Sequence, residues 1–348
     1  MTQGIKEAAN KGMLPEGLPI AKLQIINLAL LQEGNNGEIS RLLEASRESG
    51  IFYLDLQCIE RKMSAIADAL YNLTRDLYDM PYEDKMMYDV DKLDKMKCNG
   101  YKPVGRNFGG LSGQRDGFET YAIPKSGILG LEGHQDFSRP AIIDKYMGTL
   151  RDFTQTVHSI ADTVNESLSA ALQMPQSANL RLYHRLDAPS SDIVRLLKYQ
   201  PQPMQQRGAP HAAHTDLGTL TFLFTKQPGL QICPPGTDDW MWVLPMEGHA
   251  IVNLGDAMSL LTNGYLRPCV HKVGPLPNQP MPTRYSFAYM LRPEDQAPMT
   301  GPKTSFIPPR DPNQPIFTAA EWLEKKFKVL RSDARPKDQD WVMTGRQW

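Results

Sequence analysis

Two histidines and one aspartate stand in the sequence at a spacing that suits a metal ion. His214 and Asp216 form a His-x-Asp pair, and His271 follows after a run of strand-like sequence. Two imidazoles and one carboxylate hold Fe(II) on one side and leave the other side open for further ligands. Zinc prefers tetrahedral sites with nitrogen and sulfur ligands, and no cysteine stands at ligand spacing here. The pattern predicts an iron site with His214, Asp216 and His271 as ligands.

Strand geometry and a downstream arginine extend this prediction. Residues i and i+2 of a strand share a face, so His214 and Asp216 are expected to reach one metal, whereas His211 is expected to project to the opposite side. Further along, Arg284 offers a permanently charged planar fork that suits a carboxylate. This combination predicts an iron oxygenase that uses an oxo acid as co-substrate.

The candidate ligands fall in the part of the chain that is richest in strand signals. Short β-rich segments, punctuated by Gly, Pro and Asn, predict a sandwich or barrel. These segments are residues 193–199, 219–224, 229–232, 241–244, 249–254 and 283–291. We therefore expect the ligands to lie in a β core.

Helical patterns flank this core. Apolar spacing predicts helices over residues 38–49 and 63–78, and a long scaffold helix over 140–173. The other expected elements are an extended entry segment over 18–30, a strand over 51–56, and a helix that begins at the capping box Thr318-x-x-Glu321 and ends near Leu330. Gly-rich residues 95–133 predict a loop that covers the substrate. The predicted regions, 1–140 and 141–348, are expected to form one compact α+β unit with a mainly β core.

Composition excludes several classes of partner. The 348 residues carry a formal net charge of −1, with 41% apolar and 22% charged residues, which predicts an ordinary globular protein without a basic surface for nucleic acid. The sequence contains no run of 18 apolar residues, so no membrane span is expected, and the N-terminus lacks the apolar core of a signal peptide. Four scattered cysteines predict free thiols in a reducing, cytoplasmic compartment. The expected partner is a small molecule.

Several short motifs in this order resemble one family. Residues 193–290 look like the Fe(II)- and 2-oxoglutarate-dependent oxygenases of the isopenicillin N synthase-like superfamily. The resemblance rests on residues 214–221 (HTDLGTLT), 228–231 (PGLQ), 253–256 (NLGD), Asn263-Gly264, His271 and Arg284-Tyr-Ser286. The segments 50–53 (GIFY) and 80–85 (MPYEDK) are also similar to the family, so the resemblance covers nearly the whole chain.

The resemblance implies a double-stranded β-helix, or jelly roll, in a protein that is expected to be monomeric. It implies that His214, Asp216 and His271 bind iron, and that Arg284 and Ser286 hold the distal carboxylate of 2-oxoglutarate. Tyr199 matches the tyrosine of the family's Asn-x-Tyr motif, which also contacts the oxo acid. Leu197 stands at the Asn position of that motif and removes one hydrogen bond to the co-substrate.

The reaction implied by the resemblance is an O2-dependent oxidation of an unactivated C–H bond. Hydroxylation, desaturation, epoxidation or cyclisation of a small natural-product-type molecule would be coupled to the conversion of 2-oxoglutarate into succinate and CO2. An intact carboxylate at Asp216 argues against halogenation, which needs that iron position for halide. The candidate substrate contacts are Tyr101, Arg106, Phe108, Tyr121, Gln231, Met241 and Phe287, with Trp348 as a candidate lid.

Two other interpretations stay open at this stage. An iron oxidase that clamps its own substrate with Arg284 and Ser286 would need no 2-oxoglutarate, and the departure at Leu197 favours keeping this alternative. A non-catalytic jelly-roll binding protein is the alternative from a different class. The intact ligand set together with Arg284 favours an enzyme over this second alternative.

Overall fold

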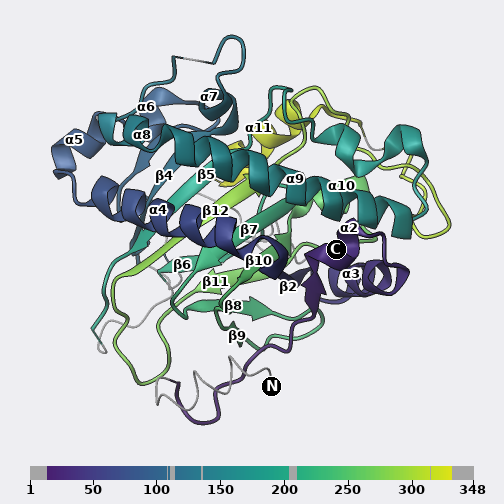
Figure 1. The fold of residues 1–348 in the computed structure, drawn as a ribbon, viewed down its shortest axis with the longest axis horizontal. Coiled ribbons are helices and arrows are strands. Elements are labelled where there is room, and N and C mark those ends of the chain that lie inside the picture. The colour runs from purple at the N-terminus through teal and green to yellow at the C-terminus, as the bar shows by residue number, and fades with distance from the viewer. Residues whose placement is uncertain are drawn as a thin grey trace.

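The chain folds into two facing β-sheets, and its longest helices lie along one side of them (Figure 1). The computed structural model describes residues 14–107, 109, 114–134, 136–203, 210–313 and 315–330. The larger sheet has the strand order β1-β2-β10-β7-β12-β5-β4-β3, and the smaller has the order β6-β11-β8-β9. An apolar cluster joins Tyr199 and Ile251 of the larger sheet to Ile232 and Val273 of the smaller. The architecture confirms the predicted jelly roll.

The described strands are short and nearly all antiparallel to their neighbours. In chain order they are β1 (Ile25–Asn27), β2 (Ile51–Asp55), β3 (Gly100–Lys102), β4 (Phe118–Pro124), β5 (Ile193–Tyr199), β6 (His211–His214), β7 (Leu220–Thr225), β8 (Leu230–Cys233), β9 (Met241–Val243), β10 (His249–Leu254), β11 (Val270–Val273) and β12 (Arg284–Leu291). Strand β2 pairs with β10 in register Ile251↔Tyr53, so residues before and after position 140 share the larger sheet.

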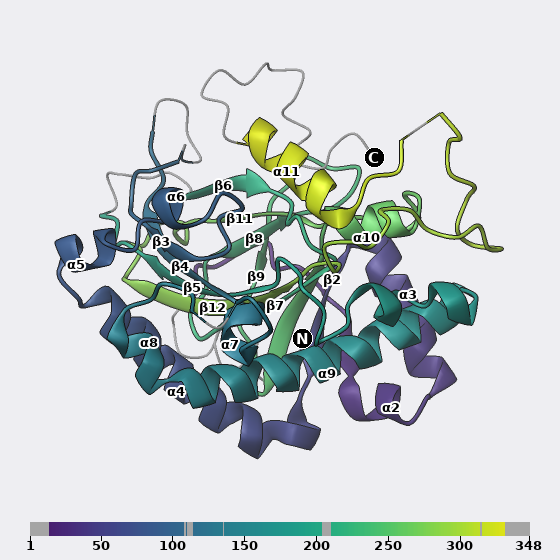
Figure 2. The same ribbon diagram turned by 90° about the horizontal axis from the view of Figure 1, so that it is seen from above.

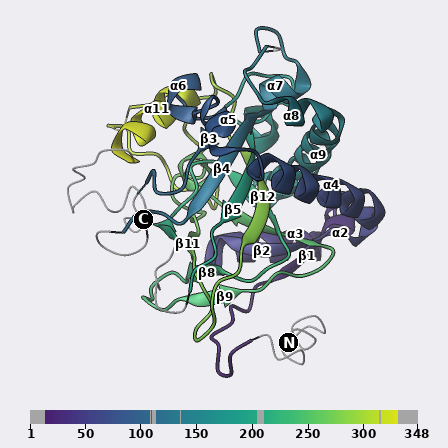
Figure 3. The same cartoon turned by 90° about the vertical axis from the view of Figure 1, so that its left-hand side faces the viewer.

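The described helices are α2 (Leu28–Gln32), α3 (Asn36–Glu48), α4 (Glu60–Tyr78), α5 (Tyr82–Met86), α6 (Val90–Leu93), α7 (Lys125–Leu129), α8 (Ala141–Lys145), α9 (Met147–Ala171), α10 (Asp256–Leu261) and α11 (Ala319–Leu330). Helices α4 and α9 run along the outer face of the larger sheet (Figure 2). Seen from the side, they lie beyond the larger sheet, away from β8 and β11 (Figure 3).

The apolar stripe predicted for the scaffold helix is buried against the larger sheet. Phe153 of α9 makes edge contacts with Phe224 of β7 and Phe287 of β12, at ring-centroid distances of 5.6 and 5.4 Å. Burial of each such ring stabilises the fold by roughly 1.5–3 kcal/mol. The predicted single helix over 140–173 is wrong in one respect, since it divides at Tyr146 into α8 and α9.

The predicted substrate-covering loop over residues 95–133 is largely wrong. Strands β3 and β4 and helix α7 lie within it, and β4 pairs with β5 along its whole length. Six of the seven residues of β4 are buried, including Glu119, which forms an ion pair with Lys85. Burial of both faces removes the alternation of apolar and polar residues by which a strand is recognised.

The predicted end of α3 at Gly50 and the predicted start of α11 at a capping box are both confirmed. Gly50 follows α3 with φ +65°, and a Cβ at this position would lie 2.4 Å from the carbonyl oxygen of Arg267. At α11 the Thr318 hydroxyl accepts a hydrogen bond from the Glu321 N–H, and Glu321 accepts one from the Thr318 N–H. This reciprocal pair is the predicted capping box.

A buried polar network ties α9 to the larger sheet. His158 Nε2 lies 2.7 Å from the carbonyl oxygen of His184, and His184 Nε2 lies 2.8 Å from the Thr219 hydroxyl. Burial, partly opposed by a hydrogen bond to Leu180, lowers the pKa of His184 to about 4. His184 is therefore neutral in the folded protein near pH 7.

This network predicts that stability falls as the pH drops from about 6.5 towards 4. The unfolded chain protonates His184 near its ordinary pKa of about 6.5, whereas the folded protein resists protonation until about pH 4. The stability contributed by neutral His184 is present above pH 6.5, and on the order of 3 kcal/mol of it is lost by pH 4. Urea unfolding at pH 7.5 and 4.5 measures this loss. His184→Gln should flatten the dependence, whereas the exposed control His134→Gln should keep it; equal slopes in all three proteins would refute the assignment.

Candidate metal and co-substrate site

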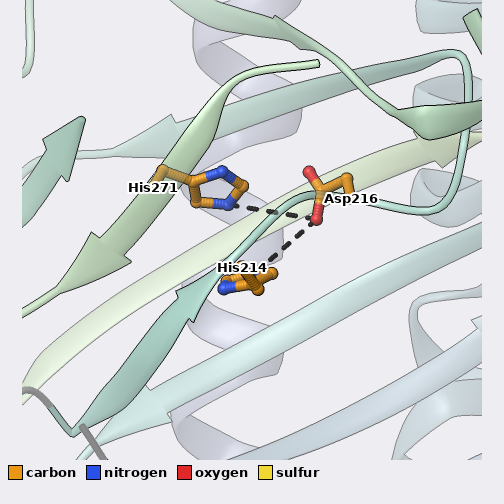
Figure 4. A group of neighbouring side chains, drawn as sticks. All are labelled: His214, Asp216 and His271. Atoms are coloured by element: carbon orange, nitrogen blue, oxygen red, sulfur yellow. Dashed lines mark ion pairs between the residues drawn. The ribbon is translucent and has the colours of Figure 1, made fainter. Parts of the chain in front are cut away.

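His214, Asp216 and His271 converge at one end of the smaller sheet (Figure 4). Strands β6 and β11 pair in the register His271↔His214, which brings the two rings to a centroid distance of 4.3 Å. The Oδ1 atom of Asp216, in the turn after β6, lies 3.7 Å from His214 Nε2 and 3.9 Å from His271 Nε2. One potential ligand atom from each residue lies within 4.8 Å of the others, which is the predicted cluster.

Backbone carbonyls fix which imidazole nitrogen faces the cluster. His214 Nδ1 lies 2.8 Å from the carbonyl oxygen of Ala212, and His271 Nδ1 lies 3.0 Å from that of Cys269. A carbonyl oxygen only accepts, so each Nδ1 carries the proton and each Nε2 presents a lone pair to the cluster. Burial and the neighbouring His271 lower the pKa of His214 to about 4, which keeps that ring neutral.

The Asp216 carboxylate is anchored through its other oxygen. Oδ2 accepts hydrogen bonds from the Thr221 hydroxyl at 2.7 Å and from Asn253 Nδ2 at 2.9 Å. Burial alone raises the pKa of Asp216, but the two histidines and these hydrogen bonds outweigh it and lower the pKa to about 2. The carboxylate is therefore ionised, with Oδ1 directed at both histidines.

This anchoring predicts that Asn253→Ala and Thr221→Val each weaken Fe(II) affinity by about 10–100-fold, the usual cost of losing a partner that orients a ligand. Both changes leave the three ligands in place and release the carboxylate to rotate. Anaerobic Fe(II) titration measures the affinity, with Thr225→Val on the same strand as a matched control. An affinity unchanged in both variants would show that neither residue orients Asp216.

Two glycines allow the backbone packing behind the Asp216 turn. A Cβ on Gly218 would lie 2.2 Å from the carbonyl oxygen of Leu291, and a Cβ on Gly255 would lie 2.6 Å from that of Asp216. The N–H of Asp256 also donates to the Asp216 carbonyl at 2.8 Å. These close contacts give a physical reason for the glycines in the two motifs that carry the family resemblance.

The expected position of His211 is wrong. Its ring stacks on His214 and lies tilted against Phe118, each at a centroid distance of 4.2 Å, so it lies beside the cluster. The register explains this, because the pairs His271↔His214 and Val273↔His211 set three residue steps of β6 against two of β11. This irregularity breaks the strict alternation of side chains on which the prediction depended. His211 is still outside the three-residue ligand cluster.

Arg284 lies in the interior beside the other two predicted co-substrate residues. It is 1% exposed, its Nη1 donates to the Ser286 hydroxyl at 3.3 Å, and its guanidinium carbon lies 4.9 Å from the centre of the Tyr199 ring. The Nε atom donates to the carbonyl of Gln227 at 3.3 Å, and Nη2 has no partner among the described residues. The structure thus brings Arg284, Ser286 and Tyr199 together as predicted.

The residues present fit a divalent metal and a carboxylate ligand. Two imidazoles and one ionised carboxylate form the donor set that Fe(II) takes in proteins. An orphaned donor on a buried guanidinium is costly unless a ligand pairs with it, and a carboxylate supplies the matching acceptors.

Four of the predicted substrate contacts lie outside the space between the two sheets, as the pairing of the strands shows. Phe287 and Tyr121 each pair with Leu196, and all three pack in the helix-facing core, which also includes Tyr101. Gln231 pairs with Lys272 and so lies on the face of the smaller sheet opposite His271. These four residues therefore do not line the space between the sheets.

Of the remaining predicted substrate contacts that the structure describes, only Met241 is placed on the face that carries the candidate metal ligands. Met241 pairs with Ile232, which pairs with His271, so Met241 shares the face of the metal cluster. Arg106 forms an ion pair with Asp89, with Nη2 and Oδ2 3.0 Å apart, and with Asp91. Phe108 and Trp348 lie outside the described residues.

Sequence reasoning also missed Lys102, a buried cation near the cluster. Its Nζ forms an ion pair with Asp116 at 2.5 Å and lies 3.8 Å from the centre of the Phe118 ring, which in turn contacts the ring of His211. Burial, partly offset by Asp116, lowers the pKa of Lys102 to about 8. No sequence pattern predicts a buried cation at this position, because residues 95–133 are predicted to form a loop.

Comparison with known proteins identifies the class. Residues 190–293 match the model of the 2OG-Fe(II) oxygenase superfamily, and residues 23–133 match that of the non-haem dioxygenase in morphine synthesis N-terminal family. The 2-oxoglutarate-dependent dioxygenase gloE of Glarea lozoyensis is 32% identical over 92% of this chain and 92% of its own length. The 2-oxoglutarate-dependent dioxygenase ecdG of Aspergillus rugulosus is 32% identical over 77% of this chain and 80% of its own.

Solved structures share the fold. A full-length Neurospora crassa protein in complex with alpha-KG superposes with a TM-score of 0.72 at 20% identity, covering 90% of this chain and 97% of that one. The rice dioxygenase for auxin oxidation gives a TM-score of 0.67 at 20% identity, covering 88% and 95%.

The chain therefore belongs to the 2OG-Fe(II) oxygenase superfamily. It is a non-haem dioxygenase whose cofactors are iron and 2-oxoglutarate. Among the described helices, none is both long and apolar enough to cross a bilayer.

Proposed function

We propose that His214, Asp216 and His271 bind the iron of this dioxygenase and that Arg284, Ser286 and Tyr199 bind the distal carboxylate of 2-oxoglutarate. The observation that carries the proposal is the convergence of three potential ligand atoms within 4.8 Å, with a buried guanidinium nitrogen on the facing sheet that has no hydrogen-bond partner among the described residues. The reaction is the oxidation of an unactivated C–H bond in a small natural-product-type molecule, by hydroxylation, desaturation or cyclisation, with succinate and CO2 as co-products.

The residues of the chain bind, orient and shield in this proposal. When bound, iron and 2-oxoglutarate supply the oxidising chemistry. The two imidazoles present Nε2 lone pairs because Ala212 and Cys269 hold the Nδ1 protons. Thr221 and Asn253 keep Oδ1 of Asp216 directed at the metal.

Burial and hydrogen-bonding groups around Arg284 favour binding of the oxo acid. Arg284 is almost fully shielded from water, which strengthens its pairing with a carboxylate. The nearby Ser286 hydroxyl offers a further hydrogen bond, whereas Leu197 offers none at the position where the family carries Asn. The Arg284 fork is expected to dominate the binding.

Succinate formation tests this function against an oxidase that uses no 2-oxoglutarate. The purified protein is incubated with Fe(II), O2 and a panel of small molecules, with and without 2-oxoglutarate, and succinate and oxidised products are quantified by mass spectrometry. The proposal expects both to depend on 2-oxoglutarate and to rise together when a substrate is present. Oxidation of a panel compound without 2-oxoglutarate would assign the protein to the other type of oxidase.

We also propose that the protein works as a cytoplasmic monomer in which residues 1–140 and 141–348 act as one unit. Cys58, Cys98 and Cys269 are thiols rather than disulfides, which supports a reducing compartment. The pairing of β2 with β10 supports a single unit.

A further inference from the structure

Arg195 is a second guanidinium on the face of the larger sheet that carries the proposed 2-oxoglutarate residues. It lies in the middle of β5, between Val194 and Leu196, which pack toward the helices. Alternation along the strand therefore places Arg195 on the same face as Tyr199. Tyr199 pairs directly with Arg284, so both arginines face the smaller sheet and its metal cluster.

The guanidinium of Arg195 forms no ion pair with any residue in the described part of the chain. Its Nη1 lies 3.9 Å from Met290 Sδ, a weak acceptor, and its buried Nε has no hydrogen-bond partner there. The neighbouring lysine on the same strand is different, because Lys198 Nζ lies 3.7 Å from Glu119 Oε1. The lack of a partner is thus specific to the residue that faces the interior.

Small neighbours flank Arg195 in the larger sheet and leave part of this residue uncovered. The residues directly opposite on the two flanking strands are Ala288 of β12 and Ala122 of β4, the smallest side chains that a chiral residue offers. Arg195 keeps part of its surface exposed although both alanines are buried. A ligand that enters between the sheets can therefore reach it.

An unpaired guanidinium in this setting is costly. Burial, with a contribution from Arg292, lowers the pKa of Arg195 from its usual range, although an arginine in a protein stays protonated. The nearby carboxylate of Asp216 opposes that shift, so Arg195 interacts electrostatically with a member of the candidate metal-binding cluster. A desolvated charge is tolerated where a ligand supplies its partner.

We propose that Arg195 binds an anionic group of the primary substrate, most simply a carboxylate, and thereby orients the substrate at the metal. The inference rests on the proposed function, in which Arg284 would bind the distal carboxylate of 2-oxoglutarate. Arg195 and Tyr199 are four residues apart, about 13 Å along the strand. Arg195 is thus a separate anion site, and the substrate class is a small organic acid.

The first test needs no knowledge of the substrate. Arg195→Met keeps the aliphatic stem and removes the uncompensated charge, so the melting temperature of the ligand-free protein should rise by about 2–4 °C. Lys198→Met on the same strand removes a cation that has a partner, and its melting temperature should not rise. A fall in the melting temperature of Arg195→Met would overturn the proposal, because it would show that the guanidinium has a stabilising partner within the protein itself.

The second test uses matched probes. Benzoate, phenylacetate and hexanoate, each paired with its uncharged amide, are added to the anaerobic protein loaded with Fe(II) and saturating 2-oxoglutarate, and the melting temperature is measured. The acids should stabilise the wild type and Lys198→Met more than the amides do, Arg195→Lys should keep part of this difference, and Arg195→Met should lose it. Equal effects of acids and amides on the wild type, or a difference that survives in Arg195→Met, would contradict the proposal.

The visible charge-transfer band of the Fe(II)–2-oxoglutarate complex separates the two levels of inference. The band should form in the wild type and in Arg195→Met alike. Its absence from the wild type would contradict the proposed function itself. A band in both proteins, combined with equal responses to acids and amides, would contradict the role of Arg195 alone.

Discussion

Asp216→Ala is expected to abolish Fe(II) binding and succinate formation while leaving the fold intact. Its carboxylate is the anionic member of the cluster, and Oδ1 lies within 4 Å of both imidazole Nε2 atoms. Losing an outer partner of a metal ligand costs about 10–100-fold, so losing the ligand itself should cost more than that. His214→Ala should behave in the same way, because no other described residue joins the cluster.

Fe(II) affinity and succinate yield, measured beside circular dichroism, check this prediction. Asp68→Ala is the control, since Asp68 is an exposed aspartate that pairs with Lys226 on the surface. It should match the wild type in both measurements. Succinate formation by Asp216→Ala at the wild-type rate would remove Asp216 from the ligand set.

Arg284→Met should raise the KM for 2-oxoglutarate by about 30-fold or more while Fe(II) affinity is retained. Truncating one member of a buried, hydrogen-bonded charge pair costs about 2–5 kcal/mol, which corresponds to this range. Arg284→Lys should recover only part of the affinity, because a lysine keeps the charge but lacks the planar fork. The separation of the two sites is the informative feature: one variant loses the metal, the other the oxo acid.

Initial rates of succinate formation over a range of 2-oxoglutarate concentrations measure this effect. Arg185→Met is a suitable control, because Arg185 is exposed and pairs with Glu294 at the surface. An unchanged KM in Arg284→Met would mean that the oxo acid binds elsewhere. Loss of Fe(II) binding in the same variant would instead show that Arg284 supports the metal site.

The residue types and spacing predict candidate site residues that the fold does bring together. His214, Asp216 and His271 are recognisable as candidates because metal ligands must be side chains of particular kinds, and Arg284 because a carboxylate needs a cation. The anchors Thr221 and Asn253 stood in recognisable motifs, but their role depends on hydrogen bonds to one carboxylate oxygen, which spacing does not reveal.

The errors have a common physical origin in strand pairing. The position of His211 depends on an irregular register between β6 and β11. Strand β4 was missed because both of its faces are buried. Phe287 and Gln231 were assigned to the interior without the pairing partners that decide which face a residue occupies. Register is set by contacts between distant segments, so the local pattern was insufficient in each case.

Anaerobic titration of the protein with Fe(II) and 2-oxoglutarate tests the central claim most directly. If His214, Asp216 and His271 hold the metal and Arg284 holds the oxo acid, a weak visible charge-transfer band should appear in the wild type only when both are present. The band should be absent from Asp216→Ala, and in Arg284→Met it should require far more 2-oxoglutarate. A wild-type protein that neither binds iron nor develops the band would contradict the account.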